Sequence, residues 1–212
     1  MTFEALEDFE MDSGSCPHCG QPMTARLLSV LDQTERQYRK HLAAGTACAE
    51  NFPDPGDQQS ALLEDVRSLW NVGSIFRSSD GAGLTTLYLT GITGCPPRKE
   101  IAKTSLGAEE NVRWRYHWNS LSVLKTLKQH GVLLLGLERT AGSQPLNQFR
   151  LQPGQRVCLI VGNEVSGLSQ EALSVCDVVC DLPMHGVKES LNVAVAFGIA
   201  AYFLNWERAH PT

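Results

Sequence analysis

Three short segments of the chain combine glycines with polar side chains that could do chemistry. The first, residues 71–77, reads NVGSIFR and follows an apolar run. On a helix, Asn71, Ser74 and Arg77 are spaced by single turns, so their side chains can share a face. Gly73 permits close approach of another backbone, and the Arg77 guanidinium suits a phosphate or a carboxylate. An ordinary capped helix with a solvated arginine explains the same residues.

The second segment lies at the end of a strongly apolar run. Residues 159–168 read LIVGNEVSGL, so Gly162 and Gly167 flank the carboxylate of Glu164. Glycines at such a place let main-chain N–H groups face a ligand, and a carboxylate at a strand end can accept hydrogen bonds. A tight turn whose glutamate caps the helix that follows at Ser169 explains the segment equally well.

The third segment, residues 182–193, reads LPMHGVKESLNV. Pro183 ends a strand and Gly186 bends the loop, and we expect Ser190 to open a helix as its N-cap. Asn192 then lies at the start of an almost wholly apolar stretch, where a buried amide needs hydrogen-bond partners. A helix that is apolar nearly all round must be buried against more than one neighbour, in the core or at a subunit interface.

The elements around these segments predict an α/β fold. Five short apolar runs alternate with helical patterns, which is typical of a mostly parallel sheet flanked by helices. The predicted strands are Leu62–Val66, Thr86–Thr90, Val132–Leu137, Val157–Val161 and Val178–Leu182, and the predicted helices are Asn71–Gly81, Ser120–His130, Ser169–Ser174 and Ser190–Trp206. Ligands of such sheets bind at the carboxyl ends of the strands, which is where the three segments fall.

Charge divides the chain into two parts. The first 66 residues carry 12 acidic and four basic side chains, residues 67–212 carry 11 and 14, and the net charge is −5. This balance argues against a protein that simply coats nucleic acid, although the basic body can meet a polyanion locally. A linker-like stretch at residues 51–58 predicts an acidic extension over residues 1–60, with one helix at 25–43, and a main domain over residues 61–212.

Cysteine usage and hydropathy bear on location and on metals. Seven cysteines without a recognisable export signal favour a reducing, cytoplasmic compartment. The longest apolar stretch, residues 193–204, is too short to span a bilayer. Cys16 and Cys19 form a CxxC knuckle of the type that binds zinc. Because a structural zinc needs four ligands and no second CxxC follows, we expect a local turn rather than a metal site.

Together and in this order, the three segments resemble the SpoU-type (TrmH-like) RNA 2′-O-ribose methyltransferases of the SPOUT superfamily. The resemblance covers about residues 61–207 and is closest to short members of the family. It is carried by Asn71-Val72-Gly73 with Arg77, by Gly162-Asn163-Glu164 with Gly167-Leu168, and by Leu182-Pro183-Met184 with Ser190-Leu191-Asn192-Val193. Residues 103–109, KTSLGAE, resemble the connecting loop of the family.

The resemblance implies a C-terminal trefoil knot that binds S-adenosyl-L-methionine, and a homodimer in which the last helix packs against its mate. The cofactor-binding residues that it implies are Leu137, Glu138, Gly162, Leu182 and Leu191. The catalytic residues that it implies are Arg77, Asn71, Glu164, Ser190 and Asn192.

The implied reaction transfers the sulfonium methyl group to a ribose 2′-hydroxyl of tRNA or rRNA. The protein must align oxygen, carbon and sulfur and stabilise charge on the oxygen. Because free arginine stays protonated, we expect Arg77 to grip an RNA phosphate and orient the hydroxyl. Either Arg77 or Glu164 then takes the proton.

RNA contact is expected from basic residues of the main domain, because the N-terminal extension is acidic. The expected RNA-binding residues are Arg67, Arg98, Lys99, Lys103, Arg113 and Arg115. The alternative function is a non-catalytic, knotted RNA-binding or assembly protein, but the intact catalytic set favours the enzyme. A nucleotide-dependent oxidoreductase is disfavoured because it requires GxGxxG after the first strand, where this chain has NVGSIFR.

Overall fold

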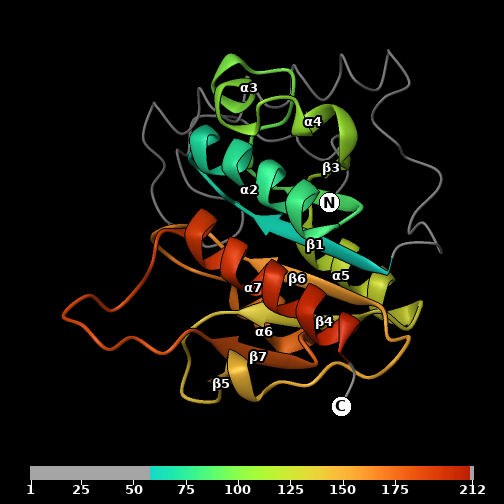
Figure 1. Cartoon of the computed structure of the whole chain (residues 1–212), viewed down its shortest axis with the longest axis vertical. Coiled ribbons are helices and arrows are strands. Elements are labelled where there is room, and N and C mark those ends of the chain that lie inside the picture. Colours follow the sequence, from blue (N-terminus) through green and yellow to red (C-terminus); the bar gives the residue numbers. More distant parts are fainter. Residues whose placement is uncertain (1–57, 211–212) are drawn as a thin grey trace, which may run out of the picture.

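The computed structural model describes residues 58–210, which form a parallel sheet with helices on both faces (Figure 1). Within this range the sheet has seven strands in the order β3-β2-β1-β6-β4-β7-β5, and neighbouring strands are parallel. The strands are β1 Gln59–Glu64, β2 Thr86–Thr90, β3 Arg113–His117, β4 Leu133–Leu137, β5 Gln144–Pro145, β6 Val157–Val161 and β7 Val178–Asp181.

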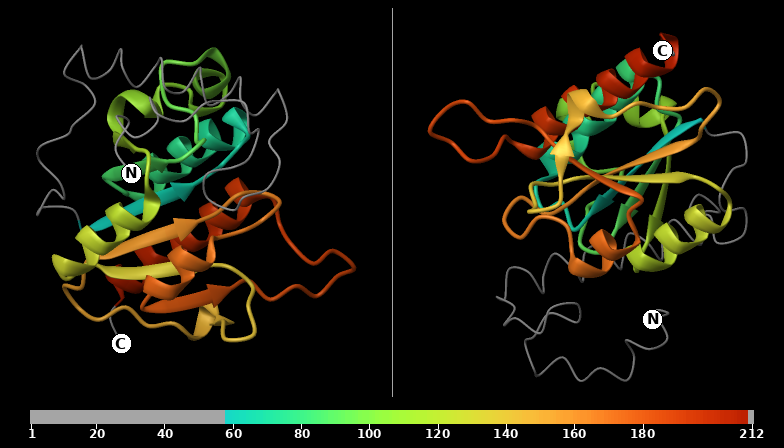
Figure 2. Two further views of the ribbon diagram at one scale, coloured as in Figure 1. Left: turned by 180° about the vertical axis from the view of Figure 1, so that it is seen from behind. Right: turned by 90° about the horizontal axis from the view of Figure 1, so that it is seen from below.

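Helices cover the two faces of the sheet unequally (Figure 2). On one face α2 packs against α7, and α3 and α4 pack against α2; on the other face α5 packs against α6. The helices are α2 Leu69–Ala82, α3 Lys99–Ser105, α4 Ala108–Asn111, α5 Ser120–Gln129, α6 Gln170–Val175 and α7 Val193–Ala209, with a 3₁₀ turn at Leu146–Gln148. None of the described helices is long and apolar enough to cross a bilayer.

Two hydrophobic clusters explain why the central strands are apolar at every position. In β1, Leu63 packs into the cluster with α2 and α7, whereas Leu62 packs into the cluster with α5 and α6. In β6, Leu159 and Ile160 divide in the same way. A parallel strand with helices on both faces must bury both sets of its side chains, so the predicted α/β fold with a parallel sheet is confirmed.

Within the described residues, the predicted strands Thr86–Thr90 and Val157–Val161 are confirmed with the same bounds. The other predicted elements are confirmed with shifted ends, and two strands and two α-helices were missed. The strand β3, with the sequence RWRYH, lies at the edge of the sheet and alternates charged and aromatic residues, so it gives no apolar run. The very short β5 and the short helices α3 and α4 were also not predicted. The predicted helix at 25–43 lies outside the described residues, as does most of the predicted linker.

One helix start was predicted wrongly. Helix α7 begins at Val193 with Asn192 as its N-cap, not at Ser190. The Asn192 side-chain oxygen accepts hydrogen bonds from the N–H groups of Ala194 at 2.9 Å and Val195 at 3.3 Å. Serine and asparagine cap helices about equally well, and the second bond that the Asn192 amide makes, described below, explains why the helix starts there.

Candidate active site

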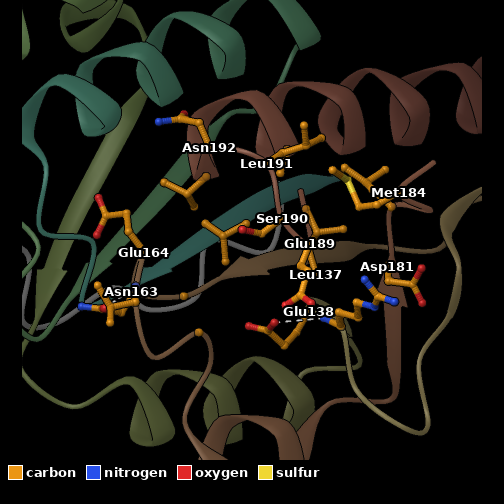
Figure 3. A pocket seen from close by; sticks show the side chains of 18 residues that line it. Leu137, Glu138, Asn163, Glu164, Asp181, Met184, Glu189, Ser190, Leu191 and Asn192 are labelled. Carbon is orange, nitrogen blue, oxygen red and sulfur yellow. Dashed lines mark hydrogen bonds between the residues drawn. The ribbon is translucent and has the colours of Figure 1, made fainter. Parts of the chain in front are cut away.

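A cavity of about 310 Å³, here called the carboxyl-end pocket, opens where β4, β6 and β7 end (Figure 3). Its walls come from the loops after these three strands and from the residues that lead into α7. All five residues expected to bind the cofactor line it, namely Leu137, Glu138, Gly162, Leu182 and Leu191. Of the expected catalytic residues, Glu164, Ser190 and Asn192 also line it. The pocket therefore joins the second and third sequence segments.

The loop after β6 folds back onto itself at Gly162. A Cβ atom at this position would clash with the backbone of Gly167 and Leu168, and Gly167 itself has a positive φ of 69°. The Asn163 side-chain oxygen accepts from the N–H groups of Val165 at 2.9 Å and Ser166 at 3.2 Å. The glycines thus allow backbone to touch backbone, and the expectation that they let N–H groups face a ligand stays a prediction.

Glu164 joins this loop to the start of α2. Its carboxylate accepts hydrogen bonds from the N–H groups of Arg67 at 2.9 Å and Ser68 at 3.0 Å, and from the side-chain amide of Asn71 at 2.9 Å. The N–H groups at the start of a helix lack partners within the helix, so they can donate hydrogen bonds to a carboxylate. The positive end of the helix dipole also stabilises the negative charge of a carboxylate there. The alternative that Glu164 caps the helix after Ser169 is wrong, because the Ser169 hydroxyl caps that helix itself.

The hydrogen bonds of Glu164 also set its acidity. Partial burial acts to raise the pKa of the Glu164 carboxyl, but the bonds from Arg67, Asn71 and Ser68 outweigh it and bring the pKa below the ordinary value of 4.5. A carboxylate stabilised in its ionised form is a weak base. Glu164 is therefore poorly suited to take a proton from a hydroxyl group and well suited to hold other groups in place.

A hydrogen bond between two side-chain amides completes a hydrogen-bonded row of three side chains. The Asn192 amide donates to the Asn71 side-chain oxygen at 3.1 Å, and the Asn71 amide donates to Glu164. The row links the starts of α7 and α2 to the loop after β6, so one residue of each sequence segment takes part. This is the convergence that the spacing of the segments predicted.

Arg77 does not join that row. It lies on α2 six residues beyond Asn71, about 9 Å along the helix axis, where its side chain is exposed. It does not line the carboxyl-end pocket. Gly73, one turn before Arg77, serves helix packing, because a Cβ there would clash with the Ile101 carbonyl and the Thr104 hydroxyl of α3. The predicted close approach of a backbone at Gly73 is thus confirmed.

The six expected RNA-binding residues lie in separate places. Arg67 precedes α2 beside Glu164, and Lys103 has its ammonium nitrogen 5.5 Å from the centroid of the Trp70 ring. Arg98 and Lys99 line a second cavity near α3. Arg113 and Arg115 lie on the edge strand β3 and alternate with Trp114 and Tyr116, so the two arginines face the α5 side of the sheet. Together with burial, the Arg115 charge lowers the pKa of His117, next on that face, to about 4.

Two residues beside the candidate site escaped sequence reasoning, and the expectation for the metal candidates stays a prediction. Trp70, next to Asn71, is 48% exposed, and no spacing rule singles out one exposed tryptophan. Asn163 was read as part of a motif, but its role in shaping the loop depends on contacts two and three residues away. Cys16 and Cys19 lie outside the described residues.

Comparison with known proteins identifies similar sequences. The model of a family described as SpoU rRNA Methylase matches residues 59–202. The 23S rRNA (guanosine-2′-O-)-methyltransferase RlmB of Xanthomonas axonopodis pv. citri is 30% identical over 141 residues, which are 66% of this chain and 55% of that protein. An uncharacterised tRNA/rRNA methyltransferase of Mycobacterium bovis is 33% identical over 173 residues, 76% of this chain and 59% of the relative. The chain thus spans little more than half the length of these relatives.

Solved structures share the fold. The SpoU methyltransferase AviRb of Streptomyces viridochromogenes, crystallised with the cofactor AdoMet, matches 76% of this chain and 66% of its own with a TM-score of 0.68 at 24% identity. An AdoMet-bound rRNA methyltransferase of Sinorhizobium meliloti matches 74% of this chain and 59% of its own with a TM-score of 0.67 at 26% identity.

Proposed function

Because the chain belongs to the SpoU rRNA methylase family, we propose that it is an RNA methyltransferase that moves a methyl group from S-adenosyl-L-methionine to a ribose 2′-hydroxyl of tRNA or rRNA. The observation that carries this proposal is the hydrogen-bonded row from Asn192 through Asn71 to Glu164 at the mouth of the carboxyl-end pocket. It places polar groups from three distant segments beside one cavity of a size that suits a small ligand.

The lining of the carboxyl-end pocket fits this cofactor. Leu137, Leu182 and Leu191 supply apolar walls, and the charged side chains around it are four carboxylates and one guanidinium. The carboxylates belong to Glu138, Glu164, Asp181 and Glu189, and the guanidinium belongs to Arg139. An excess of negative charge favours a cationic ligand, and the cofactor, when bound, supplies a methyl group on a positively charged sulfur.

The hydrogen-bonded side chains Asn71, Glu164 and Asn192 would then position the ribose hydroxyl that accepts the methyl group. The Asn71 amide is held by Glu164 on one side and Asn192 on the other, so it is preorganised to hold a ribose oxygen, and Ser190 lies exposed on the rim of the pocket. Glu164 stays ionised and acts on Asn71 and on the start of α2. We assign the stabilisation of charge, and contact with the RNA phosphate, to Arg77.

A homodimer through α7 is part of the proposal. The buried side of α7 packs into the core, whereas its outer side, together with Leu191 just before the helix, forms an apolar stripe whose members are 40–63% exposed. The apolar stripe consists of Leu191, Val195, Ile199, Tyr202 and Trp206. Large apolar side chains in a row rarely face water in a monomer, and a stripe of single-turn spacing fits the same stripe of a second copy across a two-fold axis.

The dimer would also explain the place of Arg77. Gly81, one turn after Arg77 on α2, lies directly under the Tyr202 hydroxyl, so Arg77 borders the apolar stripe. A second copy docked on the stripe would lie beside the guanidinium. The finer architecture that we propose includes the trefoil knot. It is supported by Leu182, Met184 and residues 189–192, which line the pocket together with the loop after β6.

Residues 1–60 and cellular location complete the proposal. We place the boundary of the acidic extension near residue 60, which is supported by the start of β1 at Gln59. A reducing, cytoplasmic location is supported by the free thiols of the described cysteines, Cys95, Cys158, Cys176 and Cys180.

Burial raises the pKa of the Cys176 thiol to about 11, so this thiol is unreactive.

Mass spectrometry of nucleosides from total RNA, with and without the gene product, tests the function. We expect one 2′-O-methylated nucleoside to disappear in its absence, which would also name the base. If every RNA class keeps its 2′-O-methylated nucleosides while the protein still binds RNA, the non-catalytic alternative replaces the enzyme.

A further inference from the structure

A second cavity, of about 370 Å³, lies between α3, α4 and β3 and is here called the α3–β3 cavity. Its lining includes Arg98, Lys99, Ala102, Glu109, Glu110 and Trp114. In the sheet, β2 and β1 separate β3 from β6, so the cavity lies about 14 Å or more from the loop after β6. Figure 1 shows α3, α4 and β3 at the opposite end of the molecule from β4 and β7.

The chemistry of the α3–β3 cavity fits a nucleobase better than a phosphate. The half-buried indole of Trp114 and the exposed side chains of Pro97 and Ala102 form apolar walls. The rim carries charges of both signs, with Arg98 and Lys99 opposed by the carboxylates of α4. A base presents a flat face that stacks on an aromatic ring and an edge with donors and acceptors, whereas a phosphate would be repelled by the carboxylates.

The two carboxylates of α4 differ in their contacts and exposure. Glu109 accepts from the Gly107 N–H at 3.1 Å and from the Ser105 hydroxyl, which fixes the turn between α3 and α4. Glu110 is exposed on the rim. A carboxylate in this position can accept a hydrogen bond from the exocyclic amino group of a base, so bases with an amino group are favoured over uracil.

Helix α3 connects the α3–β3 cavity to the catalytic residues. Lys99 and Lys103 lie four residues apart on α3, about 6 Å along its axis, and Lys99 lines the cavity while Lys103 lies over Trp70. Trp70 directly precedes Asn71. The Thr104 hydroxyl donates to the Trp70 carbonyl at 3.0 Å, so the spacing between the cavity and Asn71 is fixed by packing.

We propose that the α3–β3 cavity binds an unpaired base of the RNA that flanks the target nucleotide. Trp114 stacks on this base, Glu110 accepts from its amino group, and Lys99 and Lys103 contact the phosphates that lead back to Trp70. This inference rests on the proposed function, since it presumes an RNA substrate. It narrows the substrate class to single-stranded or loop RNA, because a base inside a duplex cannot enter a side-chain cavity.

The test uses the full chain and fluorescein-labelled 12-nucleotide oligoadenylate, with binding measured by fluorescence anisotropy. Because loss of one base–aromatic stack costs about 5- to 150-fold in affinity, we expect Trp114→Ala to weaken binding at least about fivefold. Trp114→Phe should retain most of the affinity. Binding of S-adenosyl-L-methionine by Trp114→Ala should equal that of the wild type, which shows that the variant is folded.

Salt dependence and a reporter base separate stacking from charge. Each phosphate contact contributes about −0.7 to the slope of log K against log salt for single strands. Lys99→Ala and Lys103→Ala should each flatten the slope, whereas Trp114→Ala and the control Lys125→Ala, on the opposite face of the sheet, should leave it unchanged. In an oligoadenylate with one 2-aminopurine, the quenching of fluorescence seen with wild type should be reduced in Trp114→Ala.

Two results would overturn the inference. One is equal affinity and equal quenching for the wild type and Trp114→Ala; the other is a wild-type protein that methylates RNA but does not bind the oligoadenylate. Either result leaves the proposed function intact. Failure of the proposed function is recognised separately, because the 2′-O-methylated nucleosides of the cell would then not depend on the protein.

Discussion

The two ends of the sheet present cavities that are held in shape in different ways. At the carboxyl-end pocket, the backbone at Gly162 packs directly on neighbouring backbone, and a hydrogen bond between the side chains of Asn192 and Asn71 links the starts of α7 and α2. At the α3–β3 cavity, the walls are side chains such as Trp114 and Ala102. The carboxyl-end pocket should lose its shape when a single methyl group is added or one side-chain hydrogen bond is lost. The α3–β3 cavity should tolerate conservative replacement of its side chains. The difference separates a site that needs exact backbone placement from one that needs a flat apolar surface.

The largest effect is expected for Arg77→Ala, which asks whether methyl transfer at the carboxyl-end pocket needs Arg77. Removal of one group that stabilises developing charge costs about 100- to 1000-fold in rate. We expect such a loss of methyl transfer with unchanged affinity for S-adenosyl-L-methionine, because Arg77 does not line the carboxyl-end pocket. Single-turnover transfer of a labelled methyl group measures it. Undiminished turnover in the variant would remove Arg77 from the catalytic set.

Gly162→Ala tests the contact of backbone on backbone. The added Cβ clashes with main-chain atoms of Gly167 and Leu168, which cannot move aside as a side chain can. We expect the affinity for the cofactor to fall about 100-fold or more. Saturating cofactor raises the unfolding temperature of the wild type because it binds the folded state, and this rise should be much smaller in the variant. Gly142→Ala is the matched control, since a Cβ there meets nothing within 4 Å. An equal rise in both variants would show that this contact does not shape the pocket.

Ile199→Glu tests whether the pocket end lies beside a second copy. Ile199 is 46% exposed in the middle of the apolar stripe, and a charge buried at such a position costs about 2 kcal/mol or more, roughly 30-fold in the dimer dissociation constant. Sedimentation equilibrium should show a dimer for the wild type and for Lys125→Glu, and monomers for Ile199→Glu. A wild-type protein that sediments as a monomer at micromolar concentration would rule out the α7 interface.

Glu164→Gln has the smallest expected effect and sharpens the role of the ionised carboxylate. The amide can still accept from one neighbour but loses the charge at the start of α2, so we expect about a tenfold slower transfer. Since the pKa of Glu164 in the folded chain lies below its ordinary value of 4.5, its charge stabilises the fold above that pH, and this contribution is lost as the pH falls through the folded-state pKa.

Urea unfolding at pH 7 and near pH 3 measures this linkage. The wild type should lose more stability between the two values than Glu164→Gln does. The exposed Glu171→Gln serves as control and should behave as the wild type. Parallel losses in the wild type and Glu164→Gln would mean that the carboxylate carries no charge-dependent role.

The residues around the carboxyl-end pocket could be predicted from the sequence much better than those around the α3–β3 cavity, for a physical reason. The carboxyl-end pocket requires a glycine at position 162 and an amide at position 192. Such restricted residue types at a fixed spacing can be recognised in the sequence. The α3–β3 cavity needs only that Trp114 of β3 and Ala102 of α3 line the same space, and two such residues in a missed strand and a missed helix carry no spacing signal. Propensity also could not choose between Ser190 and Asn192 as the cap of α7, because the choice depends on the tertiary bond from Asn192 to Asn71.

Calorimetric titration of the full chain with S-adenosyl-L-methionine tests most directly whether the pocket end is the cofactor site. We predict saturable heat with one site per chain, abolished or weakened about 100-fold by Gly162→Ala and unchanged by Trp114→Ala. The absence of heat with the wild type, or equal binding by Gly162→Ala, would contradict the account.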